Sequence, residues 1–177
     1  MFVENLFKSG LRGNMKTPGK CRGDTMIEVL ITVLILAVSI LGVAAMQVTA
    51  LKNLNSSYTS SMAWMVAEDI SERMRANPVA VLAGDYEHSS SAAPESYPDC
   101  ALSACSSADL ADYDIAAWWV IMSNTLPSPR GEIARVGGTN TFEVTIRWDD
   151  DRSGSTGINC PILSASDLEC YQFNVSL

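Results

Sequence analysis

The sequence has few of the side chains from which catalytic sites are built. It contains one histidine, His88, within a segment rich in serine, alanine and proline that spans residues 83–99. A serine hydrolase needs a histidine base beside its nucleophile, and the chain has no G-x-S-x-G segment. Glycine-rich phosphate-binding loops are missing as well. We therefore expect neither an enzyme nor a bound cofactor.

Positive charge is scarce over most of the chain. Five of the 12 lysine and arginine residues precede Asp24, against one of the 20 acids, which leaves seven basic and 19 acidic residues in the rest. This acidic excess disfavours nucleic acid as a partner. Because basic residues before an apolar segment keep that end of a chain in the cytoplasm, we expect the acidic part outside it.

Cysteine pairs with the C-x2-C spacing of zinc sites are also missing. The acidic part holds four cysteines, in the segments CALSAC and CPILSASDLEC, with no histidine nearby to complete a zinc site. An even number of cysteines outside the cytoplasm predicts disulfides. We favour the pairs Cys100 with Cys105 and Cys160 with Cys170, each of which closes a short loop, while crossed pairings stay open.

One long apolar run is present near the N-terminus. From Val29 to Ala50, the only polar side chains are those of Thr32, Ser39, Gln47 and Thr49. The run is long enough to cross a bilayer, and it exceeds the apolar region of a secretory signal peptide. A plain membrane anchor leaves Glu28 unexplained, because an acid at the edge of the apolar core costs free energy and usually marks function.

A glycine and an acid stand five residues apart at the start of this run. Lys20-Cys21-Arg22-Gly23 is followed by Asp24-Thr25-Met26-Ile27-Glu28. This segment resembles the class III signal of type IV pilins and type II secretion pseudopilins. The resemblance implies that prepilin peptidase cleaves between Gly23 and Asp24, that Asp24 becomes N-methylated, and that Glu28 pairs with an N-terminal amine during assembly. Residues 1–23 would then be a basic leader, with Met15 as a possible true start.

Hydrophobic periodicity predicts a long helix, a second helix and an antiparallel sheet. The long helix covers residues 24–76, with a membrane half over 24–50 and an amphipathic half up to the stop signal Asn77-Pro78. The second helix begins near Ser107 and ends at Pro127, and strands follow at 133–136, 141–148 and 171–177. The apolar stripe of the amphipathic half consists of Leu51, Leu54, Tyr58, Met62, Val66, Ile70 and Met74. The fold class is therefore α+β, with a long N-terminal helix packed on a C-terminal antiparallel sheet, as in the pilin fold.

The second helix and the strands after it carry a further series of residues. Its members are Asp114, Trp118 or Trp119, Leu126-Pro127, Gly131-Glu132-Ile133 and the strand-ending Trp148. The series resembles PilV-type minor pilins. The resemblance implies a single-pass inner-membrane protein with a cytoplasmic N-terminus and a periplasmic domain over residues 51–177. Such a subunit joins other minor pilins and the major pilin, helps to prime a pilus for twitching motility and adhesion, and ends at the pilus tip.

Two other functions stay open on the sequence. A minor pseudopilin of type II secretion shares the signal and the long helix, but serves protein export. An unprocessed, membrane-anchored periplasmic binding or sensor domain shares the helix and lacks the cleavage.

The segment after Trp148 has the beginning of a calcium loop. Asp149, Asp151 and Ser153 alternate before Gly154, as ligands do in an EF-hand. The twelfth position is Cys160, where that loop needs a bidentate glutamate. We therefore favour a solvated turn and keep weak Ca²⁺ binding as the alternative.

Overall fold

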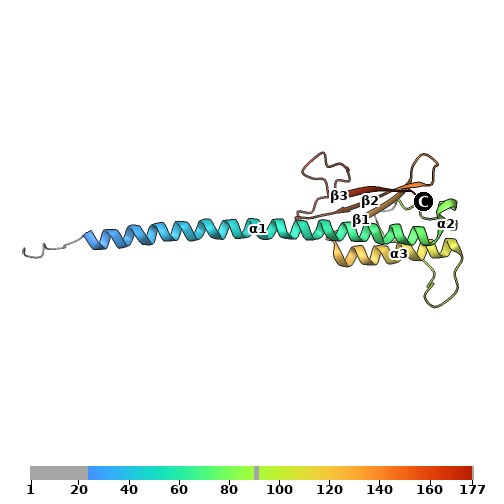
Figure 1. Ribbon diagram of the computed structural model, residues 1–177, viewed down its shortest axis with the longest axis horizontal. Coiled ribbons are helices and arrows are strands. Elements are labelled where there is room, and N and C mark those ends of the chain that lie inside the picture. The colour runs from blue at the N-terminus through green and yellow to red at the C-terminus, as the bar shows by residue number, and fades with distance from the viewer. Residues whose placement is uncertain (1–23, 90–91, 177) are drawn as a thin grey trace, which may run out of the picture. The chain divides into compact units, whose positions relative to one another are not determined.

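The computed structural model of the chain describes residues 24–89 and 92–176 (Figure 1). The elements follow in the order α1, α2, α3, β1, β2 and β3. The chain divides into two compact units between Val48 and Thr49. The leader predicted over residues 1–23, including Gly23 and Met15, lies outside the described residues.

The first unit is helical over its described residues. They belong to α1, which runs from Asp24 to Ala76 as the periodicity predicts, and the described side chains from Met26 to Val48 are all exposed. This helix is long and apolar enough to cross a membrane. The hydroxyls of Thr32 and Ser39 donate to the carbonyls of Val29 and Ile35, both at 2.8 Å. Because they bond to their own backbone, these hydroxyls need no water in an apolar setting.

Two shorter helices belong to the second unit. The helix α3, Ser107–Thr125, begins one residue earlier than a cap at Ser107 would place it, because Ser106 is the N-cap and forms a capping box with Asp109. The helix α2, Pro78–Ala83, was not predicted from the sequence. Pro78 ends α1, but proline is favourable at the first position of a helix, so the same residue also starts α2.

A three-stranded antiparallel sheet completes the second unit, in the order β1, β2, β3. The bounds are Arg130–Arg135 for β1, Thr141–Trp148 for β2 and Glu169–Ser176 for β3. The alternation predicted for β2 is confirmed, since Phe142, Val144, Ile146 and Trp148 are all buried. Thr145 is buried as well, and its hydroxyl accepts a hydrogen bond from Gln172 Nε2 of β3 at 3.2 Å. These elements confirm the predicted α+β class.

The core lies among the last turns of α1, the helix α3 and the sheet. The stripe predicted along α1 is only partly correct, because burial begins at Thr59 and not at Leu51. Val66, Ile70 and Met74 are buried, whereas Leu51, Leu54 and Tyr58 are exposed. The second unit therefore covers only the C-terminal part of the amphipathic half.

Gly131 in β1 lies directly against an aromatic ring of α3. A Cβ atom at this position would lie 2.5 Å from Trp118 Cη2 and 2.7 Å from Met122 Cε. Both side chains are fully buried, so they have little room to move away. Glycine at position 131 is thus required for the approach of β1 to α3.

Replacing Gly131 with alanine should therefore destabilise the fold. We expect Gly131→Ala to lower the free energy of unfolding by about 1–3 kcal/mol, the usual cost of overpacking a core. The measurement is urea unfolding of the full chain in detergent micelles, followed by tryptophan fluorescence. Glu143→Ala on the adjacent strand β2 is the control and should change stability by less than about 0.5 kcal/mol. Equal stability of Gly131→Ala and the unaltered chain would contradict this packing.

Candidate functional site

The strongest candidate for function is the exposed apolar surface of α1. In the first unit, the large apolar side chains from Met26 to Val48 are 50–75% exposed. In the second unit, α1 exposes a further set, namely Leu51, Leu54, Tyr58, Trp64 and Met65. Apolar exposure along one helix on this scale marks a surface that lies in lipid or against other proteins.

The apolar surface ends at a charged segment of α1. After Met65, the exposed positions up to Arg75 are occupied by Glu68, Glu72 and Arg75. Arg75 Nη1 lies 3.7 Å from Glu68 Oε1 and also forms an ion pair with Glu72. Paired surface charges of this kind remain in water at little cost, so Met65 marks the end of the surface available for apolar contacts.

Glu28 lies at the N-terminal end of this surface. It is exposed in the first unit, and Asp24 is the first residue of α1. Residues four positions apart share one face of a helix, so position 24 and Glu28 lie one turn apart on the same side. The cleavage position itself includes Gly23, which is outside the described residues.

Asp114, from the series in the second helix, joins three elements of the fold. It is buried, and its Oδ2 accepts a hydrogen bond from the Tyr86 hydroxyl at 2.7 Å. Its Oδ1 lies 3.1 Å from Arg73 Nη1 of α1, and Arg73 Nε lies 2.8 Å from Asp69 Oδ2. Burial is the main cause that raises the pKa of Tyr86, and the hydrogen bond to Asp114 raises it further. The network satisfies a buried acid, so its role is to hold α3 and the chain after α2 on α1.

Trp118 of the same series also holds α3 on α1. Its indole Nε1 donates to the Val66 carbonyl at 3.0 Å. Leu126 is buried, and its N–H bonds to the Met122 carbonyl at the end of α3. The residues of the series are therefore contacts of the fold and not a ligand site. Sequence reasoning missed Arg73 and Tyr86 as partners of Asp114, although an acid on the apolar face of a helix signals the need for such partners.

The predicted calcium candidates form a turn after β2. Asp149 accepts hydrogen bonds from the N–H groups of Ser153 at 3.1 Å and Gly154 at 2.9 Å. Asp151 accepts one from Ser153 N–H at 3.1 Å. The carboxylates thus bind the backbone of their own turn. Among the described residues, no group of three histidine, cysteine or acidic side chains is placed to hold a metal ion. The three hydrogen bonds close the turn on itself.

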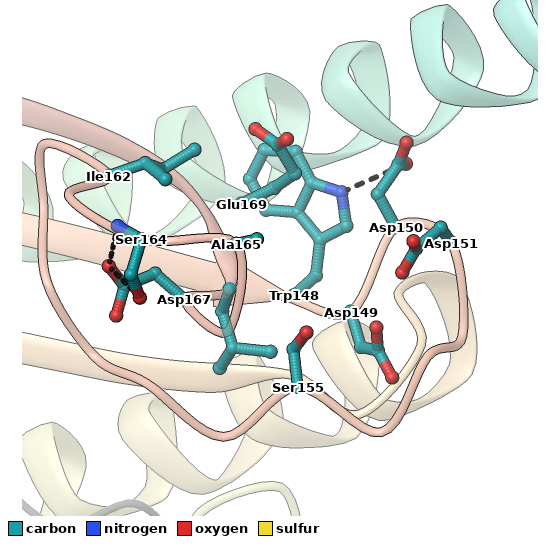
Figure 2. A pocket seen from close by; sticks show the side chains of 11 residues that line it. Trp148, Asp149, Asp150, Asp151, Ser155, Ile162, Ser164, Ala165, Asp167 and Glu169 are labelled. Atoms are coloured by element: carbon teal, nitrogen blue, oxygen red, sulfur yellow. Dashed lines mark hydrogen bonds between the residues drawn. The ribbon is translucent and has the colours of Figure 1, made fainter.

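Asp150 fastens this turn to the helix α1. Its Oδ1 accepts a hydrogen bond from the Thr59 hydroxyl. It accepts a second one from Trp148 Nε1 at 3.2 Å (Figure 2). Partial burial acts to raise the pKa of Asp150, but the hydrogen bonds from Thr59, Ser56 and Trp148 lower it overall. Asp150 is therefore held as a carboxylate between the turn and α1.

A small acidic cavity lies beside Trp148, between the segments 149–155 and 162–169 (Figure 2). Its volume is about 190 Å³, and its wall contains acids but no basic residue. Asp167 in this wall accepts hydrogen bonds from the N–H groups of Leu163 at 3.0 Å and Ser164 at 2.8 Å. Desolvation acts to raise the pKa of Asp167. These two hydrogen bonds, together with those from Asn159 and the Ser164 hydroxyl, lower the pKa overall. The acids of this cavity hold loops in place, and nothing in their arrangement selects a ligand.

Two disulfides close the loops that the cysteine spacing favoured. Cys100 is bonded to Cys105, before α3, and Cys160 is bonded to Cys170, at the start of β3. The second bond closes the segment that carries the exposed side chains of Ile162 and Leu163. Both bonds limit the freedom of the unfolded chain and belong to proteins of oxidising compartments.

The chain matches the model of a known protein family. The family Tt1218-like, described as type IV pilin Tt1218, matches residues 45–116, which is less than half of the chain. The matched stretch covers α1 from position 45, the whole of α2 and the first half of α3. No curated protein and no solved structure matches the chain. The match supports a pilin, which is a structural subunit and not an enzyme.

The lowered pKa of Asp150 makes a prediction about acid stability. Because the folded chain holds this carboxylate at a lower pKa than the unfolded chain does, Asp150 stabilises the fold above about pH 4 and ceases to do so as the pH falls through the lowered value. We expect Asp150→Asn to be less stable than the unaltered chain at pH 7, with a difference that shrinks below pH 4. Urea unfolding between pH 7 and pH 2.5 tests this, with Glu143→Gln as the control. A difference that stays constant with pH would show that Asp150 does not act through its charge.

Proposed function

We propose that this protein is a minor pilin of the PilV type, which is cleaved after Gly23, inserted in the inner membrane, and joined to other pilins to prime a type IV pilus. The observation that carries the proposal is the apolar, exposed helix that directly follows Gly23 and has Glu28 in its first turns. The family match and the two disulfides support the same assignment.

Glu28 gives the helix its role in assembly. In lipid or in a filament core, an isolated carboxylate is costly, so it needs a positive partner. Cleavage after Gly23 supplies one, because it turns the backbone nitrogen of Asp24 into an amine, N-methylated in the proposal. Within one subunit, this amine lies one helical turn from the Glu28 carboxylate. When Glu28 pairs with the amine of a neighbouring subunit, the pair sets the axial position of one subunit against the next.

The exposed part of α1 in the second unit extends the contact surface beyond the membrane. Leu51, Leu54, Tyr58 and Met65 follow one another by three, four or seven positions, so they lie along one side of the helix. Trp64 lies next to this side and is 52% exposed. A row of this kind fits the helix of another pilin, and the partners in the proposal are other minor pilins and the major pilin.

Processing by prepilin peptidase tests the first step. Co-expression with the peptidase should remove the leader that ends at Gly23, and Gly23→Ala should abolish the cleavage, since glycine leaves the scissile bond accessible. Intact-mass spectrometry of the purified chain gives the N-terminus directly. A chain that keeps its leader in the presence of active peptidase would instead be an unprocessed membrane-anchored domain.

Loss of the Glu28 carboxylate tests the second step. In a strain that lacks the gene, surface pili and twitching should decline several-fold, and Glu28→Gln should fail to restore them although the chain is still cleaved. Glu95→Gln, in an exposed loop of the second unit, is the matched control and should restore both. Electron microscopy and twitching assays measure the outcome. Unchanged pili together with impaired protein export would identify a type II secretion pseudopilin.

A further inference from the structure

The imidazole of His88 lies between a hydrogen-bond donor and an acceptor. Trp119 Nε1 donates to His88 Nε2 at 3.1 Å, and the Ala92 carbonyl oxygen lies 3.1 Å from the same nitrogen. The backbone of His88 is fixed to β1 by two bonds with Ile133, at 2.9 and 2.8 Å. Trp119 is only 5% exposed, so water has little access to its N–H group. His88 Nε2 therefore lies between the Trp119 N–H group and the Ala92 carbonyl oxygen, and we call this contact of three residues the fork.

One ring nitrogen cannot serve both partners in one protonation state. It carries either a lone pair or a proton, whereas an indole N–H only donates and a carbonyl only accepts. With a lone pair on Nε2, Trp119 is satisfied. With a proton on Nε2, the Ala92 carbonyl is the available acceptor and the buried Trp119 N–H loses its partner, which is unfavourable.

We propose that His88 is a protonation switch in the second unit. The neutral ring binds α3 through Trp119, and the protonated ring binds the Ala92 carbonyl instead. Histidine is the side chain whose charge ordinarily changes between about pH 5 and 8. Acid therefore weakens the attachment of α3 to His88 and strengthens the contact between His88 and the Ala92 carbonyl. The switch lies within the second unit and does not depend on a role in a pilus.

The charged side chains near the fork have other partners. Glu87 pairs with Arg135 of β1 at 3.3 Å, and Glu132 of β1 pairs with Arg147 at 3.0 Å. The third charged residue of β1, Arg130, donates to the Thr156 carbonyl at 3.4 Å. On α3, residues 115–123 around Trp119 are uncharged. In the segment after His88, the first described acids are the exposed Glu95 and Asp99, and the latter accepts a bond from Ala101 N–H at 3.0 Å. The protonation state of the His88 ring nitrogen thus decides which of the two contacts, with Trp119 or with Ala92, is a hydrogen bond.

The four indole groups of the chain give a direct test with internal controls. The full chain is labelled with ¹⁵N in detergent micelles, and its indole N–H signals are followed from pH 8 to pH 5. We expect the Trp119 signal to move with the same midpoint as the ring protons of His88, the only histidine. The Trp118 and Trp148 signals should stay constant, because their partners are the Val66 carbonyl and Asp150. The exposed Trp64 should stay constant as well.

Two variants separate the switch from a general effect of acid. His88→Gln keeps an acceptor oxygen but cannot titrate, so the Trp119 signal should become independent of pH. Glu87→Gln, at the adjacent position, should leave the titration in place. A Trp119 signal that is constant between pH 8 and pH 5 in the unaltered chain would overturn the proposal, and so would a titration that persists in His88→Gln. If His88→Gln fails to fold, the comparison of the Trp119 and His88 signals in the unaltered chain decides alone.

Discussion

The attachment of α3 to the second half of α1 is the constraint on which the second unit depends. Trp118 makes this attachment, because its indole donates to the Val66 carbonyl and its ring lies against Gly131 of β1. One side chain thus sets the position of two helices and the first strand. Because β1 pairs with β2, and β2 with β3, this contact connects the whole sheet to the helix pair. The buried network around Asp114 fixes the same helix pair at a second point.

This attachment leaves much of α1 for other molecules. Burial by the second unit begins only at Thr59, and the apolar side chains of Leu51, Leu54 and Tyr58 have no cover from it. In a protein that worked alone, this exposure would be unfavourable, because apolar surface in water promotes association. A subunit that contacts other subunits along its helix needs such an exposed apolar surface. The distribution of burial along one helix is therefore the strongest structural support for a pilin, beyond the family match over residues 45–116.

The acidic excess of the second unit is used largely within the fold. Asp149 and Asp167 bind backbone N–H groups of their own loops, Asp150 joins a turn to α1, and Asp114 is paired with Arg73. In each case the acid accepts a hydrogen bond from a donor of the chain itself, and the alternating acids after β2 form a turn in this way. The carboxylates at these positions therefore stabilise the loops around β2 and β3, alongside the disulfide between Cys160 and Cys170.

The sequence by itself determined the elements whose signals are local. Periodicity, a proline stop and a capping serine act over a few positions. From them follow the bounds of α1 and of β2, and the start of α3 to within one residue. The resemblance to a pilin signal around Gly23 and Glu28 likewise rests on nine adjacent residues. Only the tertiary structure decided which apolar positions of α1 are buried, which partners Asp114 has, and where the ring of His88 lies. These depend on contacts between residues 28 to 52 positions apart in the chain, such as Tyr86 with Asp114 and Val66 with Trp118. No local pattern encodes such contacts, because they arise from the packing of complete helices and strands.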